Sequence, residues 1–413
     1  MGMKLGVVGA NFGHCFIPLF QAHPLVDEVV LADLNTKLLQ ETAKTFKVKT
    51  TYSSLEELLK SDVDAIALYT PRHLHGTHTL QALRAGKHVY AAVPIASELE
   101  EIEQIIDEVK QSRLIYMSGE TSYYYGSAIY CRQRYKQGDF GDFVYGEGAY
   151  YHDMSHGFYE VFKRLGEGWQ QKAGFPPMYY PTHSTSIVLS AIDEHMTEVS
   201  CMGYKDQVND GVFKGANNLW NNPFSNETAI MRTSGGGVCR INEFRRVGFY
   251  GNKIKSVRVS LYGTQGSYEE HAGGQVWAPM DPEAFQDVTD LLEIKKLDQD
   301  LAPMDPNYFK KNVYPEFQDE PHNGYSSVHP IDRLPVELLG LPNGHQGSHQ
   351  FLVDDFVKSV DSGKLPPNHA WAAARYCIPG LIAHDSAMRE GELHKIPDLG
   401  EPPEDWELLN PDE

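Results

Sequence analysis

A glycine-containing turn between an apolar run and a helical segment constrains the fold more than any other feature of this sequence. Residues 4–8 form a short apolar run, and Gly9 and Gly13 follow it at the start of a helical pattern. Gly9 permits a tight turn out of a strand, and Gly13 permits close packing of the helix on that strand. Backbone amides at such a helix start can receive a diphosphate. The turn therefore predicts a dinucleotide-binding βαβ unit.

Apolar runs alternate with helical segments throughout residues 1–125. The predicted strands are 4–8, 29–32, 65–69, 88–92 and 114–118, and the predicted helices are 16–22, 35–46, 54–60, 76–85 and 99–111. Strands that are almost continuously apolar are typical of a parallel sheet covered on both faces. We therefore predict an α/β protein with an N-terminal Rossmann doubly wound parallel sheet, and residues 1–125 as an NAD-binding domain.

The pattern changes beyond this point. Residues 238–244 and 256–262 alternate apolar and polar side chains, which predicts a C-terminal α+β domain with a large open, mostly antiparallel sheet. Residues 270–345 are rich in Pro, Asp, Gly and Asn and predict long irregular excursions. Residues 350–359 and 369–388 predict helices that pack back on the body. We assign residues 126–413 to this second domain.

Charge and cysteine content exclude several functions. The chain has 36 Lys and Arg against 56 Asp and Glu, a formal net charge of −20. This acidity argues against nucleic-acid and anionic-membrane partners. Five widely spaced cysteines without a CxxC do not predict a disulfide framework or a thiolate zinc site. The N-terminus is typical of a first strand, and no apolar run approaches the ~18 residues that span a bilayer. A soluble, cytoplasmic protein is expected.

Several side chains follow the predicted strands and are candidates to bind the cofactor. Asp33 ends the second strand, where a carboxylate would accept hydrogen bonds from the adenosine ribose and repel a 2′-phosphate, favouring NAD over NADP. The glycine pattern departs from GxGxxG, because Asn11 stands at the second glycine position and His14 at the third. The full set of candidates is Gly9, Asn11, Phe12, Gly13, Asp33, Thr70, Pro71, His73, His75, Val93, Pro94 and Glu120.

These motifs resemble a known family. The glycine turn, the loop Thr70-Pro-Arg-His-Leu-His75 and the run from Ala85-Gly-Lys-His-Val to Pro94 are similar to the glucose-fructose oxidoreductase / inositol dehydrogenase / MocA (Gfo/Idh/MocA) family. The resemblance extends to the C-terminal segment that begins at Phe351. It implies a Rossmann domain joined to an open-sheet domain. It also implies hydride transfer between NAD(P) and a sugar or polyol, and self-association as a homo-oligomer, a dimer or a tetramer.

Two positions depart from the family pattern. The usual Glu-Lys-Pro is Ala92-Val93-Pro94 here, so the lysine that hydrogen-bonds the reacting hydroxyl in ordinary members is absent. The usual Asp-x-x-x-His is Tyr179-Tyr-Pro-Thr-His183. Both departures, together with the segment from Gly146 to Asp153, resemble the NAD-dependent glycoside hydrolases of the α-N-acetylgalactosaminidase type. Those enzymes oxidise a sugar hydroxyl with bound NAD, eliminate the aglycone, add water and return the hydride.

The resemblance also indicates candidate catalytic residues. Oxidation of a secondary alcohol needs a base that titrates near neutral pH, and His183 matches the family's histidine. Tyr179 and Tyr180 are candidates to orient the hydroxyl, although adjacent side chains should point in different directions. His152, which shares a strand face with Tyr150, and Glu147 are candidates for acid and base steps in an elimination.

A metal site is not expected. His345 and His349 have i, i+4 spacing, but Pro342, Gly344 and Gly347 favour a loop, and no HExxH motif is present. This loop is more readily explained as a substrate contact.

Three functions remain open from the sequence. The first is an NAD-dependent oxidoreductase of the Gfo/Idh/MocA type, acting on a sugar, polyol or glycoside with net redox chemistry. The second is a redox-neutral glycoside hydrolase or lyase that recycles NAD, and the absence of a lysine at Val93 favours it. The third is a non-catalytic NAD-binding sensor. The expected partners are a small carbohydrate and further copies of this chain.

Overall fold

The chain divides into two units that are not contiguous in sequence. A computed structural model describes residues 2–154, 158–163, 166–248, 255–295 and 324–410. The first unit contains Met1–Gly126, Glu293–Ala374 and Leu399–Glu413, and the second contains Ser127–Leu292 and Arg375–Asp398. Residues 293–374 therefore group with the N-terminal unit, whereas the sequence analysis assigned them to the second domain. The two units are defined by contacts between residues and do not test where a functional domain begins or ends. The domain boundaries 1–125 and 126–413 therefore stay a prediction.

The first unit is built on a parallel sheet, which confirms the predicted Rossmann fold. Within the described residues the sheet has six strands in the order β3-β2-β1-β4-β5-β6, and every neighbouring pair is parallel. The strands are β1 (Met3–Val8), β2 (Val26–Ala32), β3 (Thr51–Tyr52), β4 (Ala65–Leu68), β5 (His88–Ala91) and β6 (Tyr116–Ser118). The order reverses between β1 and β4, and ligands of open α/β sheets bind outside the strand ends at such a point.

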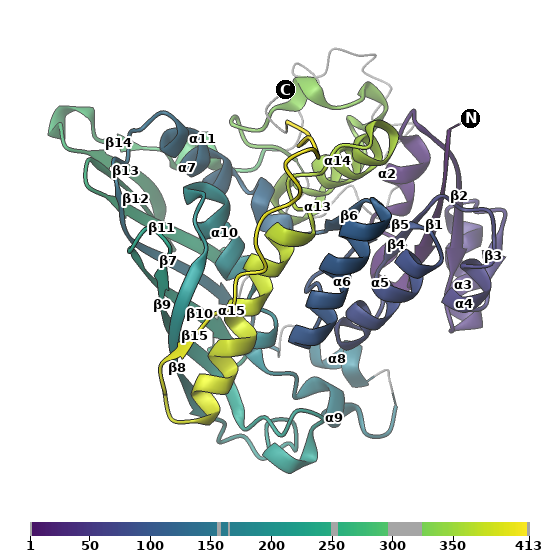
Figure 1. Cartoon of the computed structure of the whole chain (residues 1–413), viewed down its shortest axis with the longest axis horizontal. Coiled ribbons are helices and arrows are strands. Elements are labelled where there is room, and N and C mark those ends of the chain that lie inside the picture. The colour runs from purple at the N-terminus through teal and green to yellow at the C-terminus, as the bar shows by residue number, and fades with distance from the viewer. Residues whose placement is uncertain (1, 155–157, 164–165, 249–254, 296–323, 411–413) are drawn as a thin grey trace. The chain divides into compact units, whose positions relative to one another are not determined.

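Helices cover this sheet because their apolar faces are buried against it. The helices are α1 (Ala10–Gly13), α2 (Ile17–Ala22), α3 (Thr36–Thr45), α4 (Leu55–Leu58), α5 (His75–Arg84), α6 (Leu99–Ser112), α13 (Gly344–Gly347) and α14 (His349–Ser362). Helices α5 and α6 lie side by side (Figure 1). In α6 the buried residues Ile102, Ile105, Ile106 and Val109 recur at helical spacing. Ser54 and Asn35 cap α4 and α3 by accepting backbone hydrogen bonds, as N-cap residues do.

The second unit is built on a larger sheet, which confirms the predicted open and mostly antiparallel architecture. Its described strands number nine, in the order β14-β13-β12-β11-β7-β10-β9-β8-β15. They are β7 (Phe143–Tyr151), β8 (Met196–Lys205), β9 (Phe224–Thr233), β10 (Val238–Phe244), β11 (Val257–Gly263), β12 (Gly266–His271), β13 (Gly274–Pro279), β14 (Gln286–Asp287) and β15 (His394–Lys395). Strands β7 and β10 pair in parallel, while the other described pairs are antiparallel.

Helix α10 (Thr182–Ile192) of the second unit packs on strands β7, β10 and β11 of this sheet. The other helices of this unit are α7 (Gly126–Lys136), α8 (Phe158–Lys163), α9 (Trp169–Ala173), α11 (Thr289–Leu292) and α15 (Ala370–Met388), the last of which begins in the first unit. Figure 1 shows α10 and α15 lying along the sheet. Thr185 Oγ1 of α10 donates to Tyr376 O of α15 at 2.6 Å. Strand side chains thus alternate between a helix-covered face and an open face.

The long irregular segment expected over residues 270–345 is only partly irregular. Strand β13 and helix α11 are regular elements within it. Strand β13 is held on both sides, because Val276 and Trp277 pair with β14 as well as with β12. Residues 296–323 lie outside the described residues. In the described part of the chain, no helix is long and apolar enough to cross a membrane.

Candidate active site

The turn after β1 fits a dinucleotide because only glycine can occupy it. Gly9 has φ 96°, and a Cβ atom there would lie 2.5 Å from Tyr69 O at the end of β4. At Gly13 a Cβ atom would lie 2.8 Å from Val7 Cγ1, so the helical segment packs directly on β1. Both glycines are therefore required for the close packing of this turn on β1 and on the chain that follows β4.

Asp33 is held beside this turn. Its Oδ2 accepts a hydrogen bond from the backbone N–H of Ala10 at 2.7 Å, and its Oδ1 accepts one from Asn35 N–H at 2.7 Å. These contacts orient the carboxylate at the end of β2, where dinucleotide-binding folds place the acid that contacts the ribose hydroxyls. The residues present therefore fit NAD, and a negative charge at this place disfavours the 2′-phosphate of NADP.

His75 ties together the two loops that follow β4 and β5. Its Nε2 lies 2.8 Å from Thr70 O and its Nδ1 lies 2.8 Å from Pro94 O. Burial lowers the pKa of this imidazole to about 4, so the ring is neutral and donates to one carbonyl at a time. Both nitrogens face the protein, which makes His75 a support for the loops. Thr70 Oγ1 also contacts His78 Nδ1 at 3.0 Å.

The other predicted cofactor residues lie around the same strand ends. Asn11 is exposed in α1, Pro71 is exposed before a short turn, and His73 is half-buried within that turn. Val93 is buried and precedes Pro94 through a cis peptide bond. Glu120, after β6, is fully buried and its Oε1 accepts hydrogen bonds from Ser122 N–H at 2.9 Å and Ser122 Oγ at 2.7 Å.

The His345–His349 segment lies against the glycine turn. The Phe12 ring centroid is 5.8 Å from that of His345, and His349 Nε2 lies 2.8 Å from His345 Nδ1. His345 has φ 49° and forms part of a tight turn, and His349 opens α14, so only the first part of the predicted loop is irregular. Burial lowers the pKa of His349 well below its usual value.

The second unit brings part of the predicted catalytic set together on the helix-covered face of its sheet. Gly148 of β7 lies under the first turn of α10, where a Cβ atom would stand 1.9 Å from Ser184 O. The absence of a side chain lets α10 approach the strand and places His183 beside Tyr150, two residues further along the same face.

Aromatic rings surround His183. Its ring centroid lies 5.0 Å from Tyr150 and 5.3 Å from Tyr180, both edge-on. The ring of His152 lies 5.2 Å from Tyr150. His183 is buried, whereas the two tyrosines and His152 are partly exposed. The imidazole of His183 and the rings of Tyr150 and Tyr180 therefore pack against one another as one cluster.

Two charged residues of this cluster were missed by the sequence analysis. Arg245 lies with its guanidinium carbon 5.1 Å from the Tyr150 ring centroid and 6.0 Å from that of Tyr180. Its Nη2 donates to Glu243 Oε2 at 2.6 Å. Glu243 is fully buried on β10, and burial raises its pKa to about 7 against the opposing effects of Arg245, Ser184 and His183.

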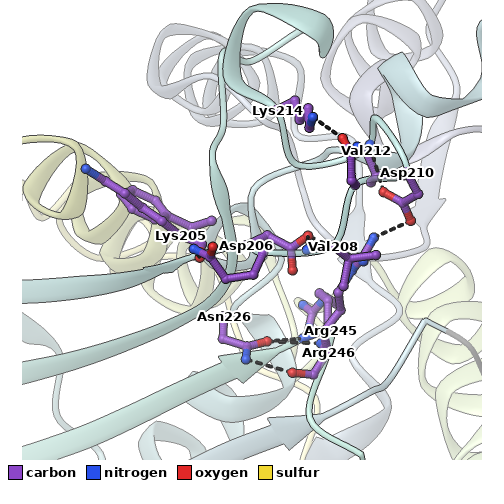
Figure 2. Close-up of polar contacts among 12 residues, drawn as sticks. Lys205, Asp206, Val208, Asp210, Val212, Lys214, Asn226, Arg245 and Arg246 are labelled. Carbon is purple, nitrogen blue, oxygen red and sulfur yellow. Dashed lines mark hydrogen bonds and ion pairs between the residues drawn. The ribbon is translucent and has the colours of Figure 1, made fainter.

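The backbone after β10 fixes the direction of Arg245. Asn226 Oδ1 accepts hydrogen bonds from the backbone N–H groups of Arg245 and Arg246 at 3.0 Å, and Asn226 Nδ2 donates to Arg246 O at 2.8 Å (Figure 2). Arg246 forms ion pairs with Asp206 and Asp210 (Figure 2). Arg245 therefore belongs to the cluster around His183, whereas Arg246 pairs with Asp206 and Asp210.

The structure leaves two predicted catalytic residues outside this cluster. Glu147 points to the open face of β7, where it accepts from Tyr145 Oη at 2.8 Å and from Arg240 Nη2 at 2.6 Å. Tyr179 turns away from Tyr180, and its ring contacts His384 at 5.1 Å. The expectation that the adjacent tyrosines point in different directions agrees with this arrangement. In the described part of the chain, no group of three or more His, Cys, Asp or Glu side chains is placed to hold a metal.

Comparison with known proteins identifies the first domain. Residues 3–120 match the family model GFO_IDH_MocA, described as an oxidoreductase family with an NAD-binding Rossmann fold. The chain carries a Gfo/Idh/MocA NAD-binding domain. The Gfo/Idh/MocA match covers β1 to β6 and includes Gly9, Asp33, Thr70 and Glu120.

Relatives extend the similarity beyond this domain. A glycosyl hydrolase family 109 protein of Streptomyces niveus is 23% identical over 426 residues, which cover 96% of this chain and 77% of the relative. An alpha-N-acetylgalactosaminidase of Shewanella oneidensis is 31% identical over 139 residues, covering 33% of this chain and 30% of the relative. Among solved structures, levoglucosan dehydrogenase in complex with NADH and levoglucosan has a TM-score of 0.72 at 17% identity, covering 97% of this chain and 100% of that chain. This last likeness establishes the two-sheet fold.

Proposed function

We propose that this chain is an NAD-dependent oxidoreductase that removes a hydride from a secondary alcohol of a sugar, polyol or glycoside. The observation that carries the proposal is the cluster of His183, Tyr150, Tyr180 and Arg245 on the helix-covered face, in a chain whose first domain binds NAD. Its fold neighbours include a levoglucosan dehydrogenase, and its relatives include glycosyl hydrolases, so the alcohol belongs to a carbohydrate.

Each side chain of the site has a separate proposed role. His183 takes the hydroxyl proton, because a neutral imidazole is a base near neutral pH. Tyr150 and Tyr180 flank it and orient the hydroxyl, and their rings offer apolar faces to a sugar ring. The Gly9 turn and Asp33 would hold NAD, whose nicotinamide ring supplies the hydride acceptor. Hydride transfer requires that ring to reach the carbon whose hydroxyl faces His183.

An activity screen tests this function. Purified protein is mixed with NAD⁺ and a panel of monosaccharides, anhydrosugars and polyols, and NADH formation is followed by absorbance. We expect NADH to appear with at least one carbohydrate. The proposal fails if no compound yields NADH while NAD binding is intact.

A redox-neutral glycosidase is the second candidate. Val93 is a buried apolar side chain at the position of the family lysine, and the family 109 relative aligns with 96% of this chain. Such an enzyme would cleave aryl glycosides without added cofactor, and solvent deuterium would enter the sugar beside the oxidised carbon. Cleavage without deuterium entry would contradict this mechanism. NAD binding without either reaction would favour the sensor.

Self-association is part of the proposal. The open face of the nine-stranded sheet exposes apolar side chains such as Met202, at 65%, and Ile230, at 47%. We propose that two copies of the chain meet through this face as a dimer or as part of a tetramer. Light scattering on purified protein should give a mass of at least two chains, and a monomer would contradict it.

A further inference from the structure

A tight turn from the C-terminal part of the chain packs on the candidate dinucleotide turn. The rings of His345 and Phe12 meet edge to face with centroids 5.8 Å apart, and the His349 ring lies 6.3 Å from Phe12 and 4.3 Å from Phe16. Phe12 belongs to α1, which begins directly after Gly9. These residues all belong to the first unit, so their contacts lie within one compact body. Segments far apart in the sequence therefore meet at the end of β1.

The turn that carries His345 is closed at its base and strained at its tip. Asn343 Oδ1 accepts a hydrogen bond from Gln350 N–H at 3.0 Å, and Gln350 Nε2 donates to Leu338 O at 2.7 Å. Between these anchors His345 has φ 49° and Gln346 has φ 56°, values that residues other than glycine seldom adopt. Such strain persists only where the surrounding structure enforces it, and it is common at ligand-binding segments. The fold thus enforces a strained turn that presents His345.

His349 fixes the orientation of the His345 imidazole. His349 Nε2 lies 2.8 Å from His345 Nδ1, and one proton occupies this contact. His349 is buried, and burial lowers its pKa well below its usual value, so this ring is neutral. His345 itself is exposed. Because Nδ1 of His345 faces His349, its Nε2 is directed away from that ring and can carry a proton to donate.

Helix α1 offers few donors of its own to a diphosphate. It spans four residues, and the N–H of Ala10, its first residue, already donates to Asp33 Oδ2 at 2.7 Å. The Asp33 carboxylate also places a negative charge beside the turn, in a chain whose formal net charge is −20. A donor from another segment would compensate for this shortage, and the exposed imidazole of His345 lies next to Phe12 of the same helix.

We propose that His345 is a cofactor-binding residue whose imidazole donates a hydrogen bond from Nε2 to a diphosphate oxygen of NAD. The inference rests on the proposed function only in taking NAD as the cofactor, and it does not depend on the carbohydrate. The sequence alone favoured a substrate contact for this loop. The packing of His345 on Phe12 is the observation that assigns the loop to the cofactor.

Calorimetric titration with NAD compares the wild-type full chain with His345→Phe. The phenyl ring keeps the edge contact with Phe12 but has no N–H to donate. NAD affinity should therefore fall at least about tenfold, the loss expected when a hydrogen bond to a charged group is removed. Gln346→Ala is the matched control, because Gln346 is the next residue of the same turn and also has a positive φ. Its NAD affinity should stay within about twofold of that of the wild type.

Chemical modification of the wild type gives a second readout. Diethyl pyrocarbonate acylates accessible imidazoles, and mass spectrometry of the peptides identifies which histidines have reacted. Saturating NAD should slow the modification of His345, because the bound diphosphate covers its Nε2. His271, an exposed histidine of the second unit, should react at the same rate with and without NAD. This measurement needs no variant, so it decides the question even if His345→Phe is unstable.

Equal NAD affinities in the wild type and His345→Phe would overturn the proposal, as would an equal loss in Gln346→Ala. Modification of His345 that is unaffected by NAD would also overturn it and would return the loop to the substrate. Neither measurement needs turnover. If NAD binds through His345 but no carbohydrate is oxidised or cleaved, the proposed function fails and this inference stands.

Discussion

His183 is the side chain on which the proposed chemistry depends most. Replacing it with Asn removes the base and keeps a similar volume, so kcat/KM should fall by about 10²–10⁴-fold while NAD affinity stays unchanged. Steady-state kinetics and calorimetric titration with NAD measure the two quantities.

Glu147→Gln is the matched control for this substitution. Glu147 was predicted as a catalytic candidate, but it lies on the open face and pairs with Arg240, a contact whose loss costs little at a partly exposed site. We expect kcat/KM to change by less than about threefold. A large loss of kcat in Glu147→Gln with an unchanged fold would contradict the assignment of the site to the helix-covered face.

Whether a residue could be found from the sequence depended on how local its signal is. Gly9, Gly13 and Asp33 follow consecutive strands of one βαβ unit, so spacing alone placed them. The position of Glu147 was also within reach, because the alternation that puts Tyr150 and His152 on one face puts Glu147 on the other. Glu243 and Arg245 gave no such signal. Alternation along β10 predicts which side chains share a face of the sheet, but it does not predict that β7 is the strand beside β10.

At the scale of single elements, the β1–α1 turn should tolerate no side chain at Gly9. Gly9→Ala introduces a Cβ atom 2.5 Å from Tyr69 O at a φ of 96°. We expect NAD affinity to fall at least about tenfold, with a loss of stability of about 1–2 kcal/mol from the left-handed backbone alone. Calorimetry and denaturant unfolding measure these effects.

Gly86→Ala separates the effect of backbone strain from the effect of the close contact with Tyr69 O. Gly86 also has a positive φ, 76°, but no atom lies within 4 Å of a Cβ built there. This variant should lose stability from backbone strain and keep its NAD affinity. Equal losses of NAD affinity in both variants would mean that the close approach to Tyr69 is unimportant.

The contact between β7 and α10 gives a second test at this scale. Gly148→Ala places a methyl group 1.9 Å from Ser184 O, so the first turn of α10 must shift. We expect a loss of about 1–3 kcal/mol in the free energy of unfolding, and a fall in kcat because His183 moves with the turn.

Gly146→Ala is the comparison for this variant, because Gly146 lies on the same face of β7 as Gly148. The nearest atom to a Cβ built at Gly146 is Phe143 Cζ, at 3.0 Å. It should cost less stability and leave kcat close to that of the wild type. A Gly148→Ala protein with unaltered kcat would show that the position of α10 does not limit the chemistry.

At the scale of the whole molecule, the first unit should lose stability in mild acid. Burial lowers the pKa of His75 and His329 to about 4, and that of His349 further below its ordinary 6.5. Between pH 4 and pH 6.5 these histidines bind protons in the unfolded chain but not in the folded unit. The free energy of unfolding should therefore be highest above pH 6.5 and fall toward pH 4, by up to about 1.4 kcal/mol per pH unit for each histidine.

Asp355 opposes this trend, because burial raises its pKa, but burial also lowers the pKa of His78 and His88 in the same unit, so five histidines act against this one carboxyl. Denaturant unfolding at several pH values measures the slope. His329→Gln removes one of the five histidines and should make the slope shallower. A free energy of unfolding that rises as the pH is lowered from 6.5 would contradict the expectation.

The parallel pairing of β7 with β10 has a consequence for biosynthesis. The residues around His183 come from segments near 150, 180 and 245, and α15, which packs on α10, ends at Met388. Contacts so distant in sequence close large loops and form slowly. A ribosome-bound chain that has emerged only to residue 200 contains all six strands of the parallel sheet but lacks β10, and it also lacks α14, which belongs to the first unit. During translation, completion of both units should therefore wait for the C-terminal part of the chain.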